Sequence, residues 1–275
     1  MGELIFIGMG LYSEEDLSLR GLYEIRRADK VFVELYTSYM AGFSLENLRR
    51  LCGKPVVFVS RREVEVEDGE MILKESREGK VAFLVPGDPM IATTHVALRI
   101  RAEKEGVKTR VIHSSSIISA AVGLSGLQSY KFGRSVTIPF PVERVFSDVP
   151  YEVIAQNRAL GLHTLCLLDI IAEEKRCMTV NEGLDYLLES EKLKKRRVVK
   201  DDTLAVGIAR AGSPNPTVHA DTIERLKELD FGPPPHSIVI PGKLHFMEAE
   251  ALITLANAPR EIIERCLHHD RGNDK

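Results

Sequence analysis

The residues with the clearest capacity for chemistry form a short turn, Pro-Gly-Asp-Pro (86–89), which follows an apolar run from Val81 to Val85. Such an apolar run is typical of a buried parallel strand. The prolines fix the backbone and remove amide donors, and Gly87 permits conformations that other residues resist. Ligands of open α/β sheets bind just beyond the carboxyl ends of strands, so the turn indicates a site for a small polar ligand near the Asp88 carboxylate. The alternative is that Asp88 is only a turn residue.

A second candidate is the Gly-Met-Gly sequence at residues 8–10, which lies between an apolar run and a helical pattern, as a dinucleotide-binding fingerprint does. Glu34, at the end of the next expected strand, could serve as the acid that binds a ribose. The third glycine of the fingerprint is missing, however, and Glu14 and Glu15 stand where a phosphate would meet the helix. Acidic side chains there repel a pyrophosphate, and the sequence has no Walker A motif. A non-phosphorylated nucleoside is therefore favoured over NAD or ATP.

Charge and composition argue against several classes of protein. The 37 basic and 40 acidic residues give a net charge of −3, which offers no electrostatic case for non-specific nucleic-acid binding. The one dense basic run, 192–197, is expected to be a solvated helix end. None of the four cysteines forms a C-x-x-C pair, so no metal site is expected, and Cys52 and Cys166 are interpreted as core thiols. No apolar stretch approaches the roughly 20 residues that span a bilayer, and the N-terminus does not resemble a signal peptide, so a cytoplasmic protein without a membrane segment is expected.

The elements that must position these residues alternate between strand and helix patterns in the first part of the chain. Five strands are expected, at Glu3–Ile7, Val31–Glu34, Val56–Val59, Val81–Val85 and Val107–Ile112. The helices between them are expected from Ser13 to Arg27, Ser44 to Leu51, Asp68 to Glu78 and Met90 to Glu105. Alternation of this kind predicts an α/β fold whose N-terminal sheet is mainly parallel.

The second part of the chain is also predicted to be α/β, although it is less regular. After a small polar stretch that starts at His113 we expect a domain crossing, which gives an N-terminal α/β domain of residues 1–113 and a C-terminal α/β domain of residues 114–275. Thr179 and Glu182 form a capping box that starts a long helix, and Asp221 is expected to cap a helix at 222–229. Further strands are expected at Ser135–Ile138, Thr164–Asp169, Thr203–Ala209 and Ser237–Ile240, and further helices at Tyr151–Leu160 and Phe246–Ala256.

Seven motifs, spread in order from residue 8 to residue 245, together resemble the diphthine synthases of the tetrapyrrole methylase superfamily. They are Gly-Met-Gly-Leu-Tyr-Ser (8–13), Ala-Asp-Lys-Val-Phe-Val-Glu-Leu-Tyr-Thr-Ser (28–38), Val-Pro-Gly-Asp-Pro-Met-Ile-Ala-Thr-Thr-His (85–95), Gly-Leu-Gln-Ser-Tyr-Lys-Phe-Gly (126–133), Gly-Leu-His-Thr-Leu (161–165), Ala-Arg-Ala-Gly-Ser (209–213) and Pro-Pro-His-Ser-Ile-Val-Ile-Pro-Gly-Lys-Leu-His (234–245). The resemblance implies two α/β domains with a cleft between them for S-adenosylmethionine, which becomes S-adenosylhomocysteine. It further implies a cytoplasmic homodimer whose protein substrate is translation elongation factor 2, trimethylated on the amino group of a 3-amino-3-carboxypropyl-histidine in diphthamide biosynthesis.

The resemblance also implies which residues contact the cofactor. Carried over position by position, they are Leu11, Asp88, Ile91, Ser116, Ile117, Leu168, Ala211 and His236. For the apolar members the alternative is plain core packing, and for His236 it is a loop histidine held by a backbone carbonyl. No catalytic side chain and no metal ligand are predicted, which suits a methyl donor that carries its own leaving group and needs mainly positioning.

Two other functions stay open at this point. One is a superfamily relative that methylates a tetrapyrrole or ribosomal RNA; the mildly acidic charge weakens the RNA case. The other, from a different class, is a non-catalytic α/β protein that senses nucleotides. Incubation with labelled S-adenosylmethionine and candidate acceptors distinguishes the three, because only an enzyme transfers label and only to its own acceptor.

Overall fold

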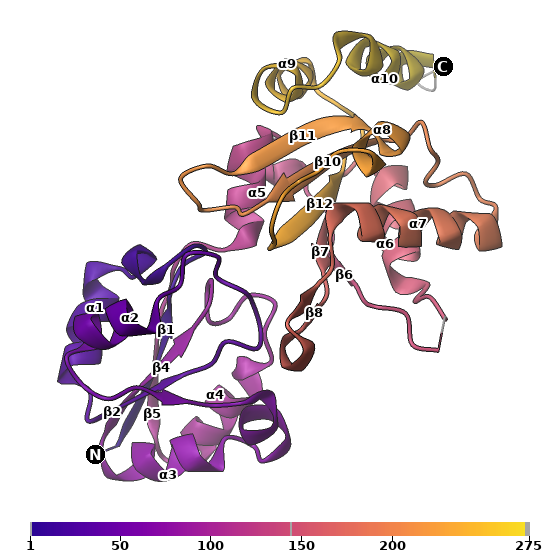
Figure 1. The fold of residues 1–275 in the computed structure, drawn as a ribbon. Helices are drawn as coiled ribbons and strands as arrows, with labels where there is room; N and C mark the ends of the chain where they lie inside the picture. Colours follow the sequence, from indigo (N-terminus) through magenta and orange to yellow (C-terminus); the bar gives the residue numbers. More distant parts are fainter. Residues whose placement is uncertain (1, 144, 273–275) are drawn as a thin grey trace. The chain divides into compact units, whose positions relative to one another are not determined.

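The computed structural model describes residues 2–143 and 145–272, and within them the side chains of all residues except 173 and 269–272. The chain forms two compact units (Figure 1): residues 1–117 with 170–175, and residues 118–169 with 176–275. The domain boundary expected after residue 113 stays a prediction. In the described chain no helix is both long and apolar enough to cross a bilayer.

The first unit is built on a parallel sheet in the order β3-β2-β4-β1-β5. Its strands are β1 (Glu3–Gly8), β2 (Lys30–Val33), β3 (Val57–Phe58), β4 (Lys80–Val85) and β5 (Lys108–Ile112). Its helices are α1 (Leu19–Arg27), α2 (Leu45–Cys52), α3 (Glu70–Glu78) and α4 (His95–Lys104), with a 3₁₀ turn at Glu14–Asp16 and a π-helical turn at Arg62–Val66. The predicted α/β fold with a mainly parallel N-terminal sheet is confirmed.

Alternate residues of the central strands pack on opposite faces of this sheet, as the two-residue period of a strand requires. Phe6 and Phe83 pack with side chains of α3 and α4, whereas Ile7 and Leu84 pack with side chains of α1 and α2. Both faces are therefore covered by helices. From β1 the chain crosses β4 to reach β2, and from β4 it crosses β1 to reach β5, so the connections leave in opposite directions between β1 and β4.

The helix predicted to start at Met90 begins only at His95, and this prediction is wrong for a local reason. The Met90 amide donates to Asp88 Oδ1 (3.0 Å) and Thr93 Oγ1 donates to the Pro89 carbonyl (2.9 Å), so these residues form a turn instead of a helix. Ala92 also has φ +54°, in the left-handed region. Buried His95 accepts from Tyr36 Oη and donates to the Pro89 carbonyl, both at 3.3 Å, and burial lowers its pKa to about 4, so it stays neutral and supports the turn.

The second unit contains a sheet in the order β11-β10-β12-β7-β6, antiparallel except for the parallel pair β6–β7. Its strands are β6 (Val136–Ile138), β7 (Thr164–Leu168), β10 (Leu204–Ala209), β11 (Thr217–Thr222) and β12 (His236–Ile240). Two short strands pair nearby: β8 (Ile170–Ile171) begins the segment grouped with the first unit, and β9 (Arg176–Cys177) follows that segment. The helices are α5 (Ile117–Ser125), α6 (Val149–Ala159), α7 (Val180–Lys194), α8 (Ile223–Lys227), α9 (Phe246–Leu255) and α10 (Arg260–Gly272).

Three features of the second unit differ from the sequence-based expectation. Strand β11 and helix α10 were not expected, and Asp221 does not cap a helix because it belongs to β11, where it faces Ala205 of β10. The N-cap of α8 is Thr222, whose hydroxyl accepts from the Arg225 amide at 3.4 Å. A polar edge strand such as β11 forms only because β10 lies beside it, which local sequence does not reveal.

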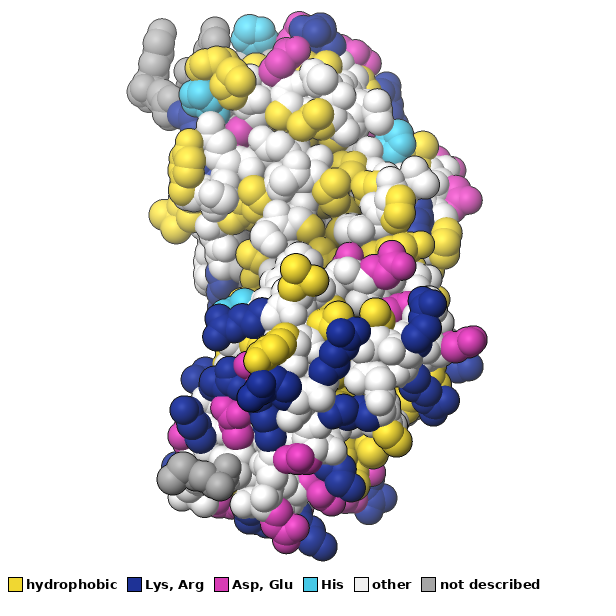
Figure 2. Space-filling model, turned by 90° about the vertical axis from the view of Figure 1, so that its left-hand side faces the viewer, with side chains coloured by type: hydrophobic (Ala, Val, Ile, Leu, Met, Phe, Trp, Pro, Cys, Tyr) yellow, Lys and Arg dark blue, Asp and Glu magenta, His cyan; other side chains and the backbone are white. Residues whose placement is uncertain are grey.

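The small net charge conceals a basic face on the first unit. Figure 2 shows Lys and Arg side chains gathered over the region of α1 and α2. The exposed arginines of these two helices are Arg20, Arg26 and Arg27 of α1 and Arg49 and Arg50 of α2. Because these arginines come from two helices, they do not form a dense basic run that could be recognised in the sequence.

Candidate functional site

The carboxyl ends of β1, β4 and β5 meet closely in the first unit. Gly10 and Gly87 exchange backbone hydrogen bonds, with N–O distances of 3.3 and 2.7 Å. A Cβ on Gly8 would lie 2.5 Å from the Gly87 carbonyl oxygen and 2.6 Å from Ser114 Cβ, so only glycine allows this approach. The point lies between β1 and β4, where the connections diverge, which is where open α/β sheets bind ligands.

The turn after β1 holds Leu11 and has its amide groups occupied by a side chain of the protein. Asp16 Oδ2 accepts from the amides of Leu11 (3.1 Å), Tyr12 (2.7 Å) and Ser13 (3.4 Å). Glu14 is buried and accepts from the Ser44 amide at 2.9 Å. The amides that would receive a phosphate in a dinucleotide-binding turn are thus already paired with a carboxylate. Asp16, and not Glu14 or Glu15, is therefore the residue that disfavours a phosphate at this turn. Glu14 instead accepts a hydrogen bond from Ser44, the N-cap residue of α2.

Asp88 joins the turn after β4 to the end of β5. Its side chain is buried, and Oδ1 accepts from the Met90 amide at 3.0 Å. Oδ2 accepts from the Ser114 amide at 3.2 Å and lies 2.8 Å from His113 Nδ1. An ionised carboxylate only accepts hydrogen bonds, so His113 donates from Nδ1, and in the neutral ring Nε2 is then the nitrogen with the lone pair. The His113 side chain is 71% exposed, which leaves that nitrogen open to a ligand.

The remaining first-unit candidates lie in the same two segments. Ile91 belongs to the turn after Asp88, donates its amide to the Asp88 carbonyl at 3.3 Å and is partly exposed. Ser116 and Ile117 follow β5, and Ile117 is the first residue of α5; both are half-buried. The five first-unit candidates therefore lie on segments that leave the same edge of one sheet. This grouping is the arrangement that a single ligand site requires.

The three second-unit candidates also share one edge of their sheet. Leu168 ends β7, Ala211 follows β10 and His236 begins β12, and these three strands are neighbours. His236 pairs with Ala209, and the next residue, Ser237, pairs with Leu167. Leu168 and Ala211 are nearly buried, with 8% and 7% of their surfaces exposed.

The His236 ring is held entirely by backbone groups. Nδ1 accepts from the Val180 amide at 3.2 Å, and Nε2 lies 3.0 Å from the Gly232 carbonyl and 3.3 Å from the Pro233 carbonyl, to which it donates. Burial is the largest effect on its pKa and lowers it, so the ring is neutral. The imidazole therefore supports the loop before β12. A contact of His236 with the cofactor stays a prediction, and its backbone is the part that such a contact would use.

Two residues at these edges were not singled out from the sequence. His113 is brought to Asp88 across 25 positions by the pairing of β5 beside β1. Arg210, with φ +52°, donates to the carbonyls of Phe231 (2.7 Å) and Pro233 (2.6 Å) and so fixes the loop that precedes His236. The motif Ala-Arg-Ala-Gly-Ser contains Arg210, but nothing in its spacing revealed this partner loop.

Glu34, considered above as a ribose-binding acid, is used inside the protein instead. Its Oε2 accepts from the amides of Tyr36 (2.8 Å) and Thr37 (3.0 Å), and Oε1 accepts from the Thr37 hydroxyl. The side chain is fully buried, and this burial raises its pKa to about 7. Glu34 therefore shapes the loop after β2 and offers no free oxygen for a ribose at the surface.

Comparison with known proteins identifies the family of this arrangement. Residues 3–227 match the Tetrapyrrole (Corrin/Porphyrin) Methylases. A diphthine synthase of Methanosarcina mazei is 51% identical over 266 residues, which cover 95% of this chain and 98% of the relative. A diphthine synthase of Methanosphaera stadtmanae is 46% identical over 261 residues, covering 95% and 98%. A crystal structure of a diphthine synthase matches with a TM-score of 0.87 and 41% identity, covering 95% of this chain and 99% of that one. The chain belongs to the diphthine synthases within the tetrapyrrole methylase family and is an S-adenosylmethionine-dependent methyltransferase.

Proposed function

We propose that the protein transfers methyl groups from S-adenosylmethionine to the amino nitrogen of a 3-amino-3-carboxypropyl-histidine on translation elongation factor 2. The observation that carries the proposal is the converging edge of the first sheet, whose amide nest after β1 is filled by Asp16. Such an edge suits an uncharged nucleoside, because it leaves no backbone donors for a phosphate. A sulfonium cofactor has a nucleoside without phosphate, and the residues present fit it.

Eight residues are the proposed cofactor contacts. Within the first unit they are Leu11, Asp88, Ile91, Ser116 and Ile117, and within the second unit they are Leu168, Ala211 and His236. The nearly buried apolar members would supply walls, and the polar groups of the 88–91 and 113–117 segments would orient the ligand. The bound sulfonium supplies an activated methyl group and a neutral thioether leaving group. The protein must then align the acceptor nitrogen with it and exclude water.

Only an amine with a free lone pair can attack the methyl group. The acceptor nitrogen must therefore be deprotonated before each transfer. An α-amino group titrates near roughly pH 8, so a fraction is neutral at physiological pH. His113 is the described side chain at the edge that best fits a proton acceptor, since Asp88 holds Nδ1 and Nε2 remains open. The first two transfers each release one proton. The third yields a quaternary ammonium with no lone pair, so transfer to nitrogen stops at three methyl groups.

Mass spectrometry of the acceptor protein tests this proposal. Elongation factor 2 that carries the 3-amino-3-carboxypropyl group should gain up to three methyl groups when incubated with the protein and S-adenosylmethionine. The same factor without that group should gain none. The single-turnover rate should rise between about pH 6 and 8 and then level off as the amine becomes neutral. An unchanged mass contradicts the proposal, and methylation of the unmodified factor contradicts its acceptor.

The resemblance supports two further parts of the proposal. A homodimer and a cytoplasmic location are implied for the family, and both belong to the function proposed here. Sedimentation equilibrium would test the first: a mass of twice the 30.7 kDa chain supports the dimer, and a mass equal to the chain contradicts it. Fluorescence of a tagged chain in the native host would test the second.

A further inference from the structure

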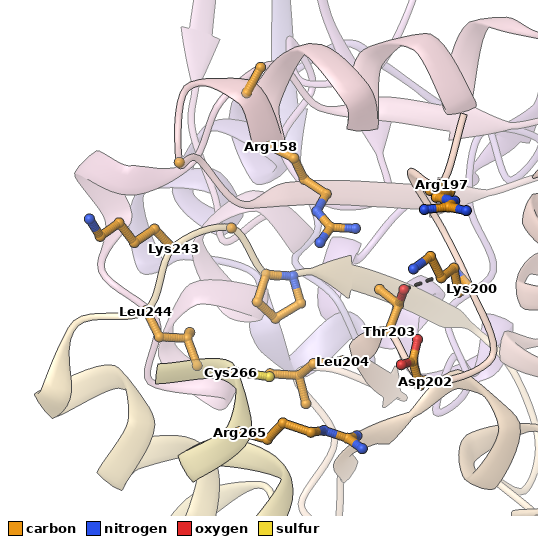
Figure 3. Close-up of a pocket in the computed structure, with 14 residues that line it drawn as sticks. Arg158, Arg197, Lys200, Asp202, Thr203, Leu204, Lys243, Leu244, Arg265 and Cys266 are labelled. Atoms are coloured by element: carbon orange, nitrogen blue, oxygen red, sulfur yellow. Dashed lines mark hydrogen bonds between the residues drawn. The ribbon is translucent and has the colours of Figure 1, made fainter. Parts of the chain in front are cut away.

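A cavity of about 510 Å³ in the second unit has five basic residues among the 14 that line it (Figure 3). It lies among the end of α6, the loop before β10, the segment after β12, and α10. Figure 3 shows five cationic side chains around it, and we call it the basic cavity: Arg158, Arg197, Lys200, Lys243 and Arg265. The only acidic residue in its lining is Asp202, while Leu204, Pro241 and Leu244 add apolar surface.

Three cations of the basic cavity differ from their neighbours in sequence because they have no carboxylate partner among the described residues. Just before them, Lys194 pairs with Asp148 at 2.6 Å and Arg196 pairs with Glu152 at 2.7 Å. By contrast, no carboxylate oxygen of the described residues lies within 4.0 Å of a side-chain nitrogen of Arg197, Lys200 or Arg265. Arg158 donates one guanidinium nitrogen to the Val198 carbonyl, a neutral acceptor. Five cations that face one cavity with a single carboxylate, that of Asp202, raise its positive potential and attract anions.

The loops that carry two of these cations are fixed by the protein. Glu191 Oε1 accepts from the Arg197 amide at 2.7 Å, and Oε2 accepts from the amides of Val198 (2.8 Å) and Val199 (3.1 Å). Burial alone would raise the pKa of Glu191, but the hydrogen bond from the Tyr151 hydroxyl (2.7 Å) together with these amides lowers it and favours the ionised form. The Lys200 amide donates to Thr203 Oγ1 at 2.9 Å, the bond drawn in Figure 3. The cations therefore project from an ordered backbone, which reduces the entropy lost when a ligand binds.

The basic cavity is separate from the residues proposed to hold the cofactor. Leu204, which lines it, is the first residue of β10, whereas Ala211 follows the last residue of the same strand. Five steps along a strand measure about 17 Å. Pro241 likewise follows the end of β12, whose first residue is His236. The cavity and the second-unit candidates thus lie at opposite edges of one sheet, and a ligand in the cavity would be a second ligand.

We propose that the basic cavity binds a small molecule that carries at least two phosphate groups. Arginine guanidinium groups match phosphate oxygens in pairs of hydrogen bonds, and lysine adds a compact charge. Five cations from four separate parts of the chain suit several phosphate groups better than one. The volume lies within the 300–1,000 Å³ that small-molecule sites occupy. This site goes beyond the proposed methyl transfer and uses none of the residues assigned to it.

Calorimetric titration of the full chain with sodium tripolyphosphate tests the proposal directly. The double substitution Lys200→Gln/Arg265→Gln removes two exposed side chains from the lining, and Arg49→Gln/Arg50→Gln removes the same charge from exposed positions of α2. We expect the first pair to weaken binding by roughly a hundredfold, about tenfold for each charged contact, and the second pair to leave it within about threefold. Orthophosphate should bind more weakly than tripolyphosphate because it reaches fewer cations.

Thiol protection gives an independent readout that does not depend on methyl transfer. Cys266 lines the basic cavity, whereas Cys177, also half-buried, lies in β9 outside it. Tripolyphosphate should slow alkylation of Cys266 and leave Cys177 unchanged. Equal weakening by both double substitutions, equal affinity for orthophosphate and tripolyphosphate, or equal protection of both cysteines would overturn the site. A failure of methyl transfer would leave all three readouts intact, so the two proposals fail separately.

Discussion

Substitution of Glu34 by Gln should change how the stability of the protein depends on pH. Glu34 is fully buried, its pKa is raised from 4.5 to about 7 by that burial, and its oxygens accept from the loop after β2. A carboxyl group whose pKa is higher in the folded state stabilises that state while it is protonated. Its contribution is complete below about pH 4.5 and is lost as pH rises through 7. Glutamine keeps the shape and cannot ionise.

The size of the effect follows from the two pKa values. At about 1.4 kcal/mol per pH unit, a rise from 4.5 to about 7 corresponds to about 3 kcal/mol between the acidic and alkaline limits. About 2 kcal/mol of this change occurs between pH 5.5 and 8, an interval that avoids strongly acidic and strongly alkaline conditions. The unfolding free energy of the wild type, measured relative to Glu34→Gln, should therefore fall by about 2 kcal/mol across that interval.

Urea unfolding followed by far-ultraviolet circular dichroism at pH 5.5, 6.5 and 8 measures this difference. Other groups titrate in the same interval, but they do so in both proteins and cancel when the two curves are subtracted. Glu46→Gln, at an exposed position of α2, is the matched control and should run parallel to the wild type. A constant difference between the wild type and Glu34→Gln would refute the reasoning, because it would mean that Glu34 has the same pKa folded and unfolded.

Three further substitutions address the edge of the first sheet. Asp88→Ala leaves two amides without an acceptor and should weaken S-adenosylhomocysteine binding by about 5- to 30-fold in calorimetry, with the chain still folded. Gly10→Ala would place Cβ 2.2 Å from Asp16 Cβ at φ +81° and should lower the unfolding free energy by roughly 1–3 kcal/mol in urea titration. His113→Gln should slow single-turnover methyl transfer by roughly 10²-fold or more, with cofactor affinity unchanged.

Each of these expectations has an outcome that contradicts it. Normal cofactor affinity in Asp88→Ala, together with a collapsed melting temperature, would make Asp88 only a turn residue. Wild-type stability in Gly10→Ala would mean that the turn after β1 is looser than the contacts indicate. If His113→Gln reacts at the wild-type rate with chemistry limiting, another group or the solvent accepts the proton. A loss confined to cofactor affinity would make His113 a binding residue instead.

Local signals in the sequence predicted the parts of the fold that depend on neighbouring residues. The helix expected from Ser44 to Leu51 is present as α2, and Gly53 takes φ +68° just after its last residue, Cys52. The capping box of Thr179 and Glu182 is present, with the Glu182 amide donating to Thr179 Oγ1 at 3.2 Å. By contrast, β11 has a half-exposed, largely polar sequence and exists through its pairing with β10. Such long-range pairing leaves no signature in a short window of sequence.

The site follows the same division between local and distant information. Asp88 could be found because its turn chemistry stands beside a strand, within a few residues. The partner that gives it a second role, His113, depends on β5 lying next to β1, which the chain order alone does not state. Asp16 lies within the helix expected from Ser13 to Arg27, and its acceptance of three successive amides depends on the actual path of the turn after β1. The sequence patterns therefore predicted which turns form the candidate site, whereas the hydrogen bonds of Asp16 and Asp88 could be assigned only from the structure.

Three carboxylates organise the loops that leave neighbouring strands of the first sheet. Asp16 follows β1, Glu34 follows β2 and Asp88 follows β4, and each accepts two or more backbone amides from nearby loops. In many nucleotide-binding proteins the amides at such an edge wait for a phosphate. Here side chains have taken that place, so the loops are ordered on folding and a ligand need not order them. What remains for the ligand is apolar surface and a few oriented polar groups, which is a reason for this edge to select a nucleoside without phosphate. The phosphate site that we propose is instead the basic cavity of the second unit, at the opposite ends of β10 and β12 from Ala211 and His236.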